Sequence, residues 1–248
     1  MRPAGSDLGG VRAVITGGGS GIGRAIAARF VDGGARVVLA GRREGSLRSV
    51  VDELGEAALA VPADVTSEES VDELFSRAAG WLGGVDVLVN SAGAFTGGSV
   101  EDVSLSEFER VMSVNVTGTF LCARAAFALM RGSGGGRVIN IGSIASNRAR
   151  AGSTAYSASK HAVWGLTQAL ALDGRADGVI VSCLNPGNTE VERRADGRSA
   201  TGGDGRREPM MSPAEVAEVA ALMAGLPDNV NLLEATIFPN DQPYIGRG

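Results

Sequence analysis

The chain has 248 residues and a formal net charge of −5; 44% of its residues are hydrophobic and 21% are charged. This composition is typical of a single packed domain with a sizeable core, and it argues against a disordered chain or a coiled coil. Because the net charge is negative and no long basic run is present, we expect no nucleic acid partner.

Two further features bear on location and on metals. The first ten residues lack the apolar core of a signal peptide, and no run approaches the roughly 18 apolar residues of a membrane helix, so we expect a cytoplasmic protein with no membrane partner. Cys122 and Cys183 lie far apart in apolar stretches, which is typical of buried, reduced thiols. His161 is the only histidine, which argues against a histidine-rich site, and we expect no metal.

Short apolar runs rich in β-branched residues alternate with helix-like segments, a pattern that predicts βαβ units. The runs that predict strands are residues 11–16, 35–40, 57–61, 85–90, 136–141, 178–184 and 232–238. Helices are predicted over residues 21–32, 67–82, 104–131 and 155–174, with candidate caps at Ser67, Ser104 and either Ser153 or Thr154. Since crossovers between parallel strands are right-handed, we expect a doubly wound α/β fold in one domain over residues 1–248.

The first predicted strand runs directly into a glycine-rich turn that opens the first predicted helix. Glycines here allow a sharp turn and the close approach of a pyrophosphate to the helix N-terminus. The spacing is GxxxGxG rather than the common GxGxxG, and a purely structural turn is the alternative. The candidate cofactor-binding residues of this turn are Gly17, Gly19, Ser20, Gly21, Ile22 and Gly23.

The second predicted strand ends in Gly41-Arg42-Arg43, at the place where an acidic residue would bind the ribose 2′-hydroxyl of NAD. A carboxylate there would repel a 2′-phosphate, whereas the guanidinium groups of Arg42 and Arg43 can pair with it. We therefore expect a preference for NADP(H), with NAD(H) possible. The alternative is that both arginines are solvated charges at the start of a helix.

The next two strand ends carry further candidates for cofactor contact, because ligands of open α/β sheets bind at the carboxyl ends of strands. Asp64 and Val65 follow the third predicted strand. Asn90, Ala92 and Gly93 follow the fourth. Asp64 has an alternative role as a cap for the helix that begins near Ser67.

Tyr156 and Lys160 are four residues apart, so in a helix they lie on the same face. A neighbouring ammonium stabilises a phenolate, which would make Tyr156 a usable acid or base. Ser143 precedes this pair by thirteen residues and follows the fifth predicted strand. A lone YxxxK pattern would usually be a surface pair on a helix.

Together these motifs resemble the classical short-chain dehydrogenase/reductase family over essentially the whole chain. The matching stretches are TGGGSGIG, Asp64-Val65, NSAG at 90–93, Asn115 in SVNVTG, Ser143 in INIGS, YSASK at 156–160 and Asn185-Pro186-Gly187. The resemblance implies a Rossmann-type parallel sheet of about seven strands, usually in the order 3-2-1-4-5-6-7. It also implies a homodimer or homotetramer.

The resemblance assigns roles to four catalytic residues. Tyr156 would exchange a proton with the substrate oxygen and Ser143 would orient that oxygen. Lys160 would bind the nicotinamide ribose and assist Tyr156, while Asn115 would hold a water that links Lys160 to solvent. The cofactor-binding residues that the resemblance adds are Tyr156, Lys160, Pro186, Gly187 and Thr189.

The implied function is an NADP(H)-dependent oxidoreductase that interconverts a secondary alcohol and a ketone or other carbonyl compound by direct hydride transfer. The alternative is a non-catalytic NADP(H)-binding sensor or scaffold of the same fold. An intact catalytic group favours the enzyme, since a sensor has no need of a tyrosine placed to move protons.

The chain departs from the family pattern at two places. The family usually has a threonine four residues after the glycine of the Pro-Gly pair, but this chain has Val191 there and Thr189 two residues earlier. The tail 239–248 replaces the usual glycine-rich ending, and we expect Pro243–Gly248 either to cross a subunit interface or to be disordered.

The polar, glycine-rich stretch 188–211 predicts a mobile lid over a ligand, with a disordered surface loop as the alternative. The other expected pocket walls are residues 94–96 and 145–150. Four arginines, which are either attractants for an acidic substrate or solvated surface charges, are Arg148, Arg150, Arg193 and Arg194. We expect His161 to serve packing or an interface rather than catalysis.

Overall fold

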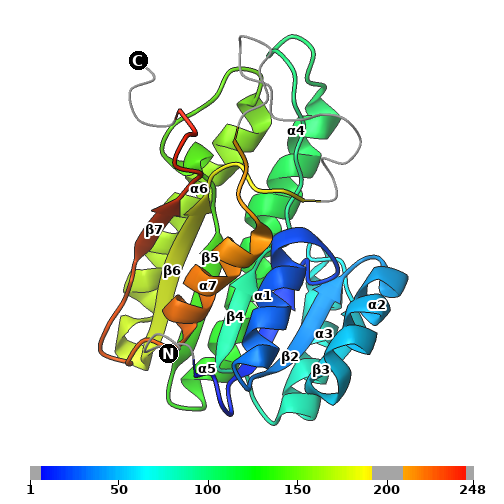
Figure 1. The fold of residues 1–248 in the computed structure, drawn as a ribbon, viewed down its shortest axis with the longest axis vertical. Coiled ribbons are helices and arrows are strands. Elements are labelled where there is room, and N and C mark those ends of the chain that lie inside the picture. Colours follow the sequence, from blue (N-terminus) through cyan, green and yellow to red (C-terminus); the bar gives the residue numbers. More distant parts are fainter. Residues whose placement is uncertain (1–6, 192–208, 244–248) are drawn as a thin grey trace.

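A single parallel sheet forms the centre of the fold. The computed structural model describes residues 7–191 and 209–243. The sheet has seven strands in the order β3-β2-β1-β4-β5-β6-β7, which confirms the expected topology (Figure 1). The strands are β1 (Arg12–Thr16), β2 (Arg36–Gly41), β3 (Ala58–Pro62), β4 (Val87–Asn90), β5 (Gly136–Ile141), β6 (Val179–Pro186) and β7 (Glu234–Ile237). All seven were predicted, with ends that differ by at most two residues.

Helices cover both faces of this sheet. They are α1 (Gly21–Asp32), α2 (Glu44–Leu54), α3 (Glu68–Leu82), α4 (Leu105–Met112), α5 (Gly118–Arg131), α6 (Thr154–Asp173) and α7 (Pro213–Ala224). One hydrophobic core lies under α1, α2 and α7, and the other lies under α3, α5 and α6. Because the central strands are buried on both faces, they read as nearly continuous apolar runs in the sequence. Helix α4 extends beyond the sheet edge at which the strands end (Figure 1).

Three helices begin after an expected cap residue, and in two of them the cap side chain accepts a hydrogen bond from the helix backbone. The Ser67 hydroxyl accepts a hydrogen bond from the Ser70 amide at the start of α3, and Ser104 forms a reciprocal capping box with Glu107 at the start of α4. Ser153 occupies the cap position of α6, but its hydroxyl donates to the Arg150 carbonyl oxygen and makes no cap hydrogen bond. The prediction of Ser153 as the cap residue is confirmed, while its side chain contributes no cap hydrogen bond.

Two helices, α2 and α7, were missing from the prediction. In α2 only Leu47 and Val50 are buried, so the apolar repeat along this short helix is weak. Helix α7 had a readable signal, because Ser212 forms a capping box with Glu215 and Pro213 occupies the first turn. The predicted helix 104–131 is helical throughout, but it includes the π-helical segment Ser113–Thr117.

The continuous helical run Leu105–Arg131 is, among the described helices, the one long and apolar enough to cross a membrane by length and composition. The prediction that no run approaches a membrane helix in length is wrong by this criterion. Half of its most apolar window is buried inside the protein, and Leu121, Cys122 and Ala126 belong to the core under α3, α5 and α6. In this fold the α5 part of the run packs into the core.

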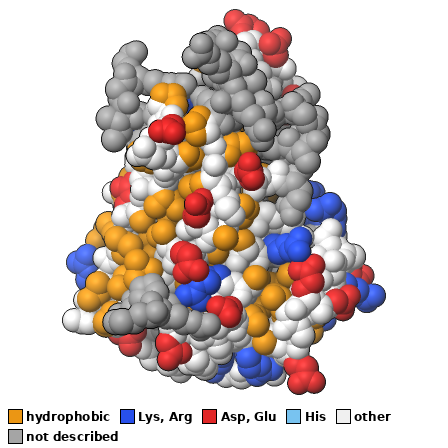
Figure 2. All heavy atoms as spheres, in the orientation of Figure 1, with side chains coloured by type: hydrophobic (Ala, Val, Ile, Leu, Met, Phe, Trp, Pro, Cys, Tyr) orange, Lys and Arg blue, Asp and Glu red, His pale blue; other side chains and the backbone are white. Residues whose placement is uncertain are grey.

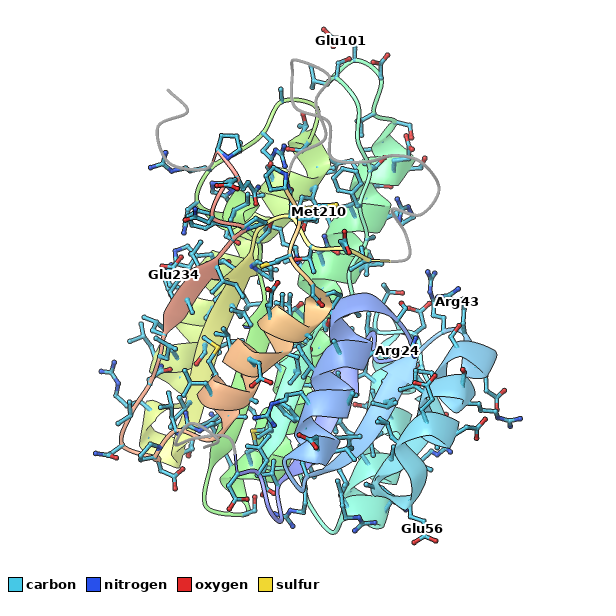
Figure 3. The ribbon with its side chains drawn as sticks, in the orientation of Figure 1. Arg24, Arg43, Glu56, Glu101, Met210 and Glu234 are labelled. Atoms are coloured by element: carbon cyan, nitrogen blue, oxygen red, sulfur yellow. The ribbon has the colours of Figure 1, made fainter. Side chains whose placement is uncertain are left out.

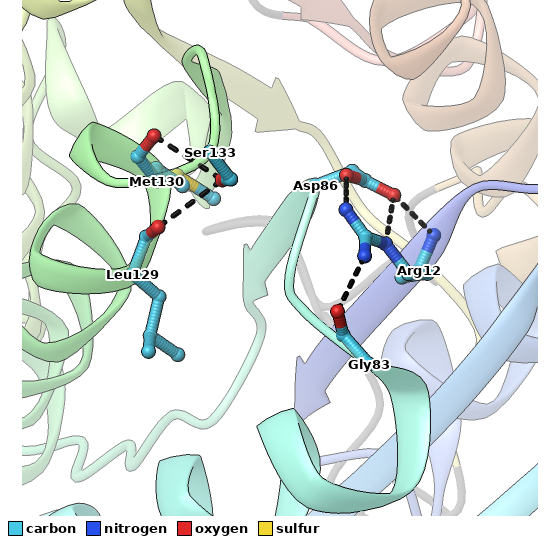
Figure 4. A network of polar contacts seen from close by, with 6 residues as sticks. All are labelled: Arg12, Gly83, Asp86, Leu129, Met130 and Ser133. Atoms are coloured by element: carbon cyan, nitrogen blue, oxygen red, sulfur yellow. Dashed lines mark hydrogen bonds and ion pairs between the residues drawn. The ribbon is translucent and has the colours of Figure 1, made fainter.

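Arg12 and Asp86 join β1 to the turn before β4 (Figure 4). The Arg12 guanidinium donates two hydrogen bonds to the Asp86 carboxylate, one of them from Nε at 2.8 Å, and the Arg12 backbone amide donates a third at 2.9 Å. A further guanidinium nitrogen donates to the Gly83 carbonyl oxygen at 2.7 Å. Burial by itself would raise the pKa of Asp86, but the hydrogen bonds and positive charge of Arg12 outweigh it and lower the pKa.

We predict that Asp86→Asn lowers the free energy of unfolding at neutral pH by about 1–2 kcal/mol, a value reduced for the partial exposure of the pair. The native pKa of Asp86 is depressed, so the stabilisation is present above the ordinary pKa of about 3.9 and is lost as the pH falls through the lower native value. Urea unfolding of both proteins at several pH values measures this. A difference that stays constant into strong acid would contradict the assignment.

Candidate active site

The loops after β1 and β4 meet at the carboxyl edge of the sheet. Thr16 ends β1, and its hydroxyl oxygen accepts hydrogen bonds from the backbone amides of Ser91 and Ala92 at 3.1 and 3.0 Å. These bonds tie the segment Ser91–Gly93 to the glycine-rich turn. Thr16 was not predicted as a site residue, although it stands directly before the turn in the sequence.

The predicted cofactor residues from Gly17 to Gly23 form this turn and the first turn of α1. Gly17 has a φ of 68°, and a Cβ at this position would lie 2.9 Å from the Ala92 amide nitrogen. A Cβ on Gly23 would collide with the Gly17 carbonyl oxygen. Ser20 gives α1 no side-chain cap, and the first turn carries no acidic residue. The turn is therefore narrow, rich in glycine and favourable to an anion, which fits a dinucleotide phosphate.

Arg42 and Arg43 follow β2 at the same edge, and both are exposed. Arg43 is the cap residue of α2, and its side chain points outward in Figure 3. Among the described residues, neither guanidinium has a hydrogen-bond or ion-pair partner. The residue that ends β2 before them is Gly41, not an acidic residue.

Asp64 and Val65 follow β3. The Asp64 carboxylate accepts hydrogen bonds from the Thr66 backbone amide at 3.0 Å and from the Thr66 hydroxyl at 2.8 Å. The backbone hydrogen bond from Thr66 is the main cause that lowers the pKa of Asp64, and the positive charge of Arg42 contributes in the same direction. Since Ser67 caps α3, the alternative that Asp64 is the cap is wrong. Val65 is buried in the core.

Asn90 ends β4, and its side chain is buried between elements. Its amide nitrogen donates to Asn140 Oδ1 at 3.0 Å and to the Thr119 carbonyl oxygen at 3.4 Å. Asn140 in turn donates to Thr167 on α6 at 2.9 Å. The Asn90 side chain therefore holds β4, β5 and the helices together, while the backbone of Ser91 and Ala92 borders Gly17 of the glycine-rich turn.

Tyr156 and Lys160 lie on one face of α6, as their spacing predicts. Lys160 is buried, and its ammonium donates to the Ile141 carbonyl oxygen at 2.7 Å. The ammonium nitrogen is 5.6 Å from the centre of the Tyr156 ring. The Tyr156 ring is half-buried and packs edge-to-face against Phe95, with ring centres 5.1 Å apart. Phe95 belongs to the expected pocket wall 94–96.

Asn115 lies in the π-helical segment between α4 and α5, where such segments are frequent at functional sites. Its side-chain oxygen accepts a hydrogen bond from the Ala94 amide at 2.7 Å, and its side-chain nitrogen donates to the Ala94 carbonyl oxygen at 3.0 Å and to Ser159 Oγ at 2.9 Å. Ser159 directly precedes Lys160 in α6. Asn115 thus fixes the segment at Ala94 against the helix that carries Tyr156.

Ser143 begins the 3₁₀ turn Ile144–Ser146 after β5. Its hydroxyl oxygen accepts a hydrogen bond from the Ala145 amide at 3.1 Å, and its own amide donates to Ser146 Oγ and to Asn185 Oδ1, each at 3.1 Å. Within the part of the chain that the structure describes, no acceptor takes the hydroxyl proton. That proton is therefore available to an external acceptor.

Pro186 ends β6, and Gly187 and Thr189 continue from it. The Gly187 amide donates to the Ile237 carbonyl oxygen at 2.7 Å, and a Cβ on Gly187 would lie 2.5 Å from Cβ of Phe238. The buried Thr189 donates from its hydroxyl to the Gly187 carbonyl oxygen at 3.1 Å and pairs with Met211 in a parallel bridge. The bridge joins the two ends of the predicted lid 188–211.

Further hydrogen bonds hold Asn188, the first residue of the predicted lid. Asn188 is buried; its amide donates to Gln242 Oε1 at 2.9 Å, and its side-chain oxygen accepts from Arg150 at 3.1 Å. Residues 192–208, which include Arg193 and Arg194, and residues 244–248 of the predicted tail lie outside the described residues. Asn188 and Gln242 were missed because they are 54 residues apart and show no local motif.

The two cysteines and the histidine are the remaining residues of interest. Cys122 and Cys183 are fully buried free thiols, as predicted, and burial raises their pKa to about 12 and about 11. His161 is exposed on α6, and its ring Nδ1 is 2.9 Å from the Ser157 carbonyl oxygen. The Cys183 thiol donates to Asn185 Oδ1 at 3.4 Å, and the charge of Lys160 acts on this thiol in the direction that lowers its pKa.

Comparison with known proteins shows which family the chain resembles. A family model described as short chain dehydrogenase matches residues 12–201. An uncharacterized oxidoreductase of Staphylococcus aureus is 37% identical over 228 residues, covering 92% of this chain and 96% of the relative. Another, from Staphylococcus saprophyticus, is 34% identical over 231 residues with the same coverage. The crystal structure of 3-ketoacyl-(acyl-carrier-protein) reductase from Brucella melitensis, complexed with NADH, is 32% identical with a TM-score of 0.84, covering 94% of this chain and 99% of that one.

Proposed function

This chain belongs to the short-chain dehydrogenase family of oxidoreductases, and from this membership we propose that it is an NADP(H)-dependent enzyme that interconverts a secondary alcohol and a ketone or other carbonyl compound. The observation that carries the proposal is the arrangement of Tyr156, Lys160 and Ser143: a buried ammonium beneath a half-exposed phenol, and a serine hydroxyl proton without an acceptor among the described residues. A bound nicotinamide dinucleotide supplies or accepts the hydride.

In the reducing direction, the Tyr156 hydroxyl gives its proton to the carbonyl oxygen of the substrate as the carbonyl carbon gains the hydride. In the oxidising direction, Tyr156 takes the proton from the alcohol. The Lys160 ammonium stabilises the negative charge on the phenolate oxygen after proton transfer. The Ser143 hydroxyl donates a hydrogen bond to the same substrate oxygen and stabilises the charge that develops there.

Asn115 helps to hold Tyr156 and Lys160 in place. By holding Ala94 and Ser159, it keeps the Phe95 wall against α6. We assign it the further role of holding a water that links Lys160 to solvent, so that the proton lost by Tyr156 is replaced. The π-helical segment favours this role, because such a segment interrupts the regular pairing of helix carbonyl groups.

The glycine-rich turn would hold the pyrophosphate at the start of α1. Backbone groups of Ala92 and Gly93 on one side and of Pro186 and Gly187 on the other would line the remainder of the dinucleotide, together with Thr189. Arg42 and Arg43 would bind the 2′-phosphate of NADP(H). Their unpaired, exposed guanidinium groups, and the absence of an acidic residue at the end of β2, support the preference for NADP(H).

We predict that Tyr156→Phe reduces the rate of carbonyl reduction by about 10²–10⁴, because the general acid is lost. The affinity for NADPH should change little, since the turn at Gly17–Gly23 and the arginines remain. Steady-state oxidation of NADPH with ethyl acetoacetate, acetophenone and cyclohexanone measures the first effect, and fluorescence titration with NADPH measures the second. A fully active phenylalanine variant would exclude Tyr156 as the acid.

We predict that Arg42→Ala weakens NADPH binding by about tenfold and leaves NADH binding unchanged, as expected for one charge-assisted hydrogen bond. The matched control is Arg48→Ala, because Arg48 is an exposed arginine that pairs with Glu44 on α2. Fluorescence titration of all three proteins with both cofactors provides the measurement. Equal affinity of the unchanged protein for NADPH and NADH would overturn the preference, and binding of neither would favour a scaffold.

We also propose assembly into a homodimer or homotetramer. Apolar side chains gather over the side of the molecule that carries α7 and β7 (Figure 2), where Leu222 and Leu233 are exposed. Such a surface is common where proteins associate. Light scattering of the purified chain should give two or four times the mass of 25.2 kDa, and a single-chain mass would contradict assembly.

A further inference from the structure

A path of hydrogen bonds runs from the edge strand β7 to Ser143. Glu234, labelled on β7 in Figure 3, accepts hydrogen bonds on Oε1 from the side-chain nitrogens of Asn185, at 2.9 Å, and Asn147. Asn185 Oδ1 in turn accepts the Ser143 amide at 3.1 Å. In the sheet, Glu234 pairs with Cys183, so the side chains of Glu234 and Asn185 lie on the same face.

The carboxylate decides the orientation of the Asn185 amide. Asn185 is fully buried, and its side chain has one accepting end and one donating end. A carboxylate only accepts, so it draws the nitrogen of Asn185 towards Glu234 and leaves the oxygen for two donors, the Ser143 amide and the Cys183 thiol. The reversed orientation would oppose two acceptors at Glu234 and two donors at Ser143, which is unfavourable in a buried place.

The same carboxylate oxygen holds the far end of the turn that Ser143 begins. Asn147 closes the 3₁₀ turn Ile144–Ser146, and it donates to Glu234. Both ends of the turn are therefore connected to Glu234, the first through Asn185 and the second directly. Gly142 brings the backbone close to Asn185, because a Cβ at Gly142 would collide with Asn185 Oδ1.

Among the described residues, no ion pair accounts for the position of the Glu234 carboxylate. Within residues 7–191 and 209–243, no lysine or arginine lies within salt-bridge distance of Glu234. Its side chain accepts hydrogen bonds from the two asparagines, and one of these, Asn185, accepts the backbone amide of Ser143. We propose that Glu234 is a positioning residue that fixes Ser143 through Asn185 and Asn147, an inference whose catalytic consequence rests on the proposed function.

The test compares Glu234→Ala with Glu234→Gln. Alanine removes the acceptor, whereas glutamine keeps one oxygen that can accept both asparagine amides. With NADPH and ethyl acetoacetate, or whichever of the three carbonyl probes the unchanged protein reduces, we expect kcat of the alanine variant to fall about 10–100-fold, since small misplacements at a reacting centre have effects of this size. The glutamine variant should recover most of the loss, and the affinity for NADPH should be unaffected in both.

A double-mutant cycle separates positioning from a general loss of structure. In a Ser143→Ala background, Glu234→Ala should cause little further loss of kcat, because the group it positions is gone. Equal losses with and without Ser143 would overturn the inference. Glu56→Gln is the control, since it removes an exposed carboxylate at a distant place in the fold (Figure 3).

Hydrogen exchange gives a readout that needs no turnover. The peptide that covers residues 142–147 should exchange faster in Glu234→Ala but not in Glu234→Gln, while α1 stays unchanged. If the alanine variant does not fold, Asn147→Ala carries the same comparison. Unchanged exchange in this peptide would overturn the inference whether or not the protein is active. A lack of NADPH oxidation by the unchanged protein with every probe would instead count against the proposed function.

Discussion

Parallel pairing brings the carboxyl ends of all seven strands to one edge of the sheet, so the loops that follow those strands meet there. For this reason Gly17 and Gly187, which are distant in the sequence, lie at the same edge of the sheet. Thr16 adds a local constraint, because its hydroxyl oxygen holds the segment after β4 against the turn after β1. The glycines of that turn are then required by space, since the backbone of Ala92 lies where a Cβ of Gly17 would be.

Helix α6 is held to this edge by buried polar contacts as well as by apolar packing. Asn90, Asn140 and Thr167 form a path across two strands to the helix. The Lys160 ammonium, which would be costly to bury without partners, donates to the Ile141 carbonyl oxygen at the end of β5. These contacts fix the height and rotation of the helix on the sheet, and thereby the place of Tyr156.

The prediction succeeded where a structural element leaves its own periodic signal. The seven strands are apolar runs, and the helix starts at Ser67 and Ser104 carry caps. It failed where the signal is weak or shared. Helix α2 buries few residues, and the capping box at Ser212 directly follows a polar stretch that we read as a lid. Ser153 is the cap residue of α6, but its hydroxyl bonds to the nearby Arg150 carbonyl oxygen instead of a helix amide, and the sequence does not show which of these a serine takes.

The sequence by itself determined the features whose partners are a few residues apart: the strand and glycine turn at Gly17–Gly23, the arginines after β2, and Tyr156 and Lys160 one helical turn from each other. The tertiary structure alone decided the pairing of Glu234 with Asn185, of Asn185 with Ser143 and of Asn188 with Gln242, which are separated by 49, 42 and 54 residues. Local periodicity carries no information about such pairs. Their partners are set by which strands are neighbours in the sheet and by the register between them.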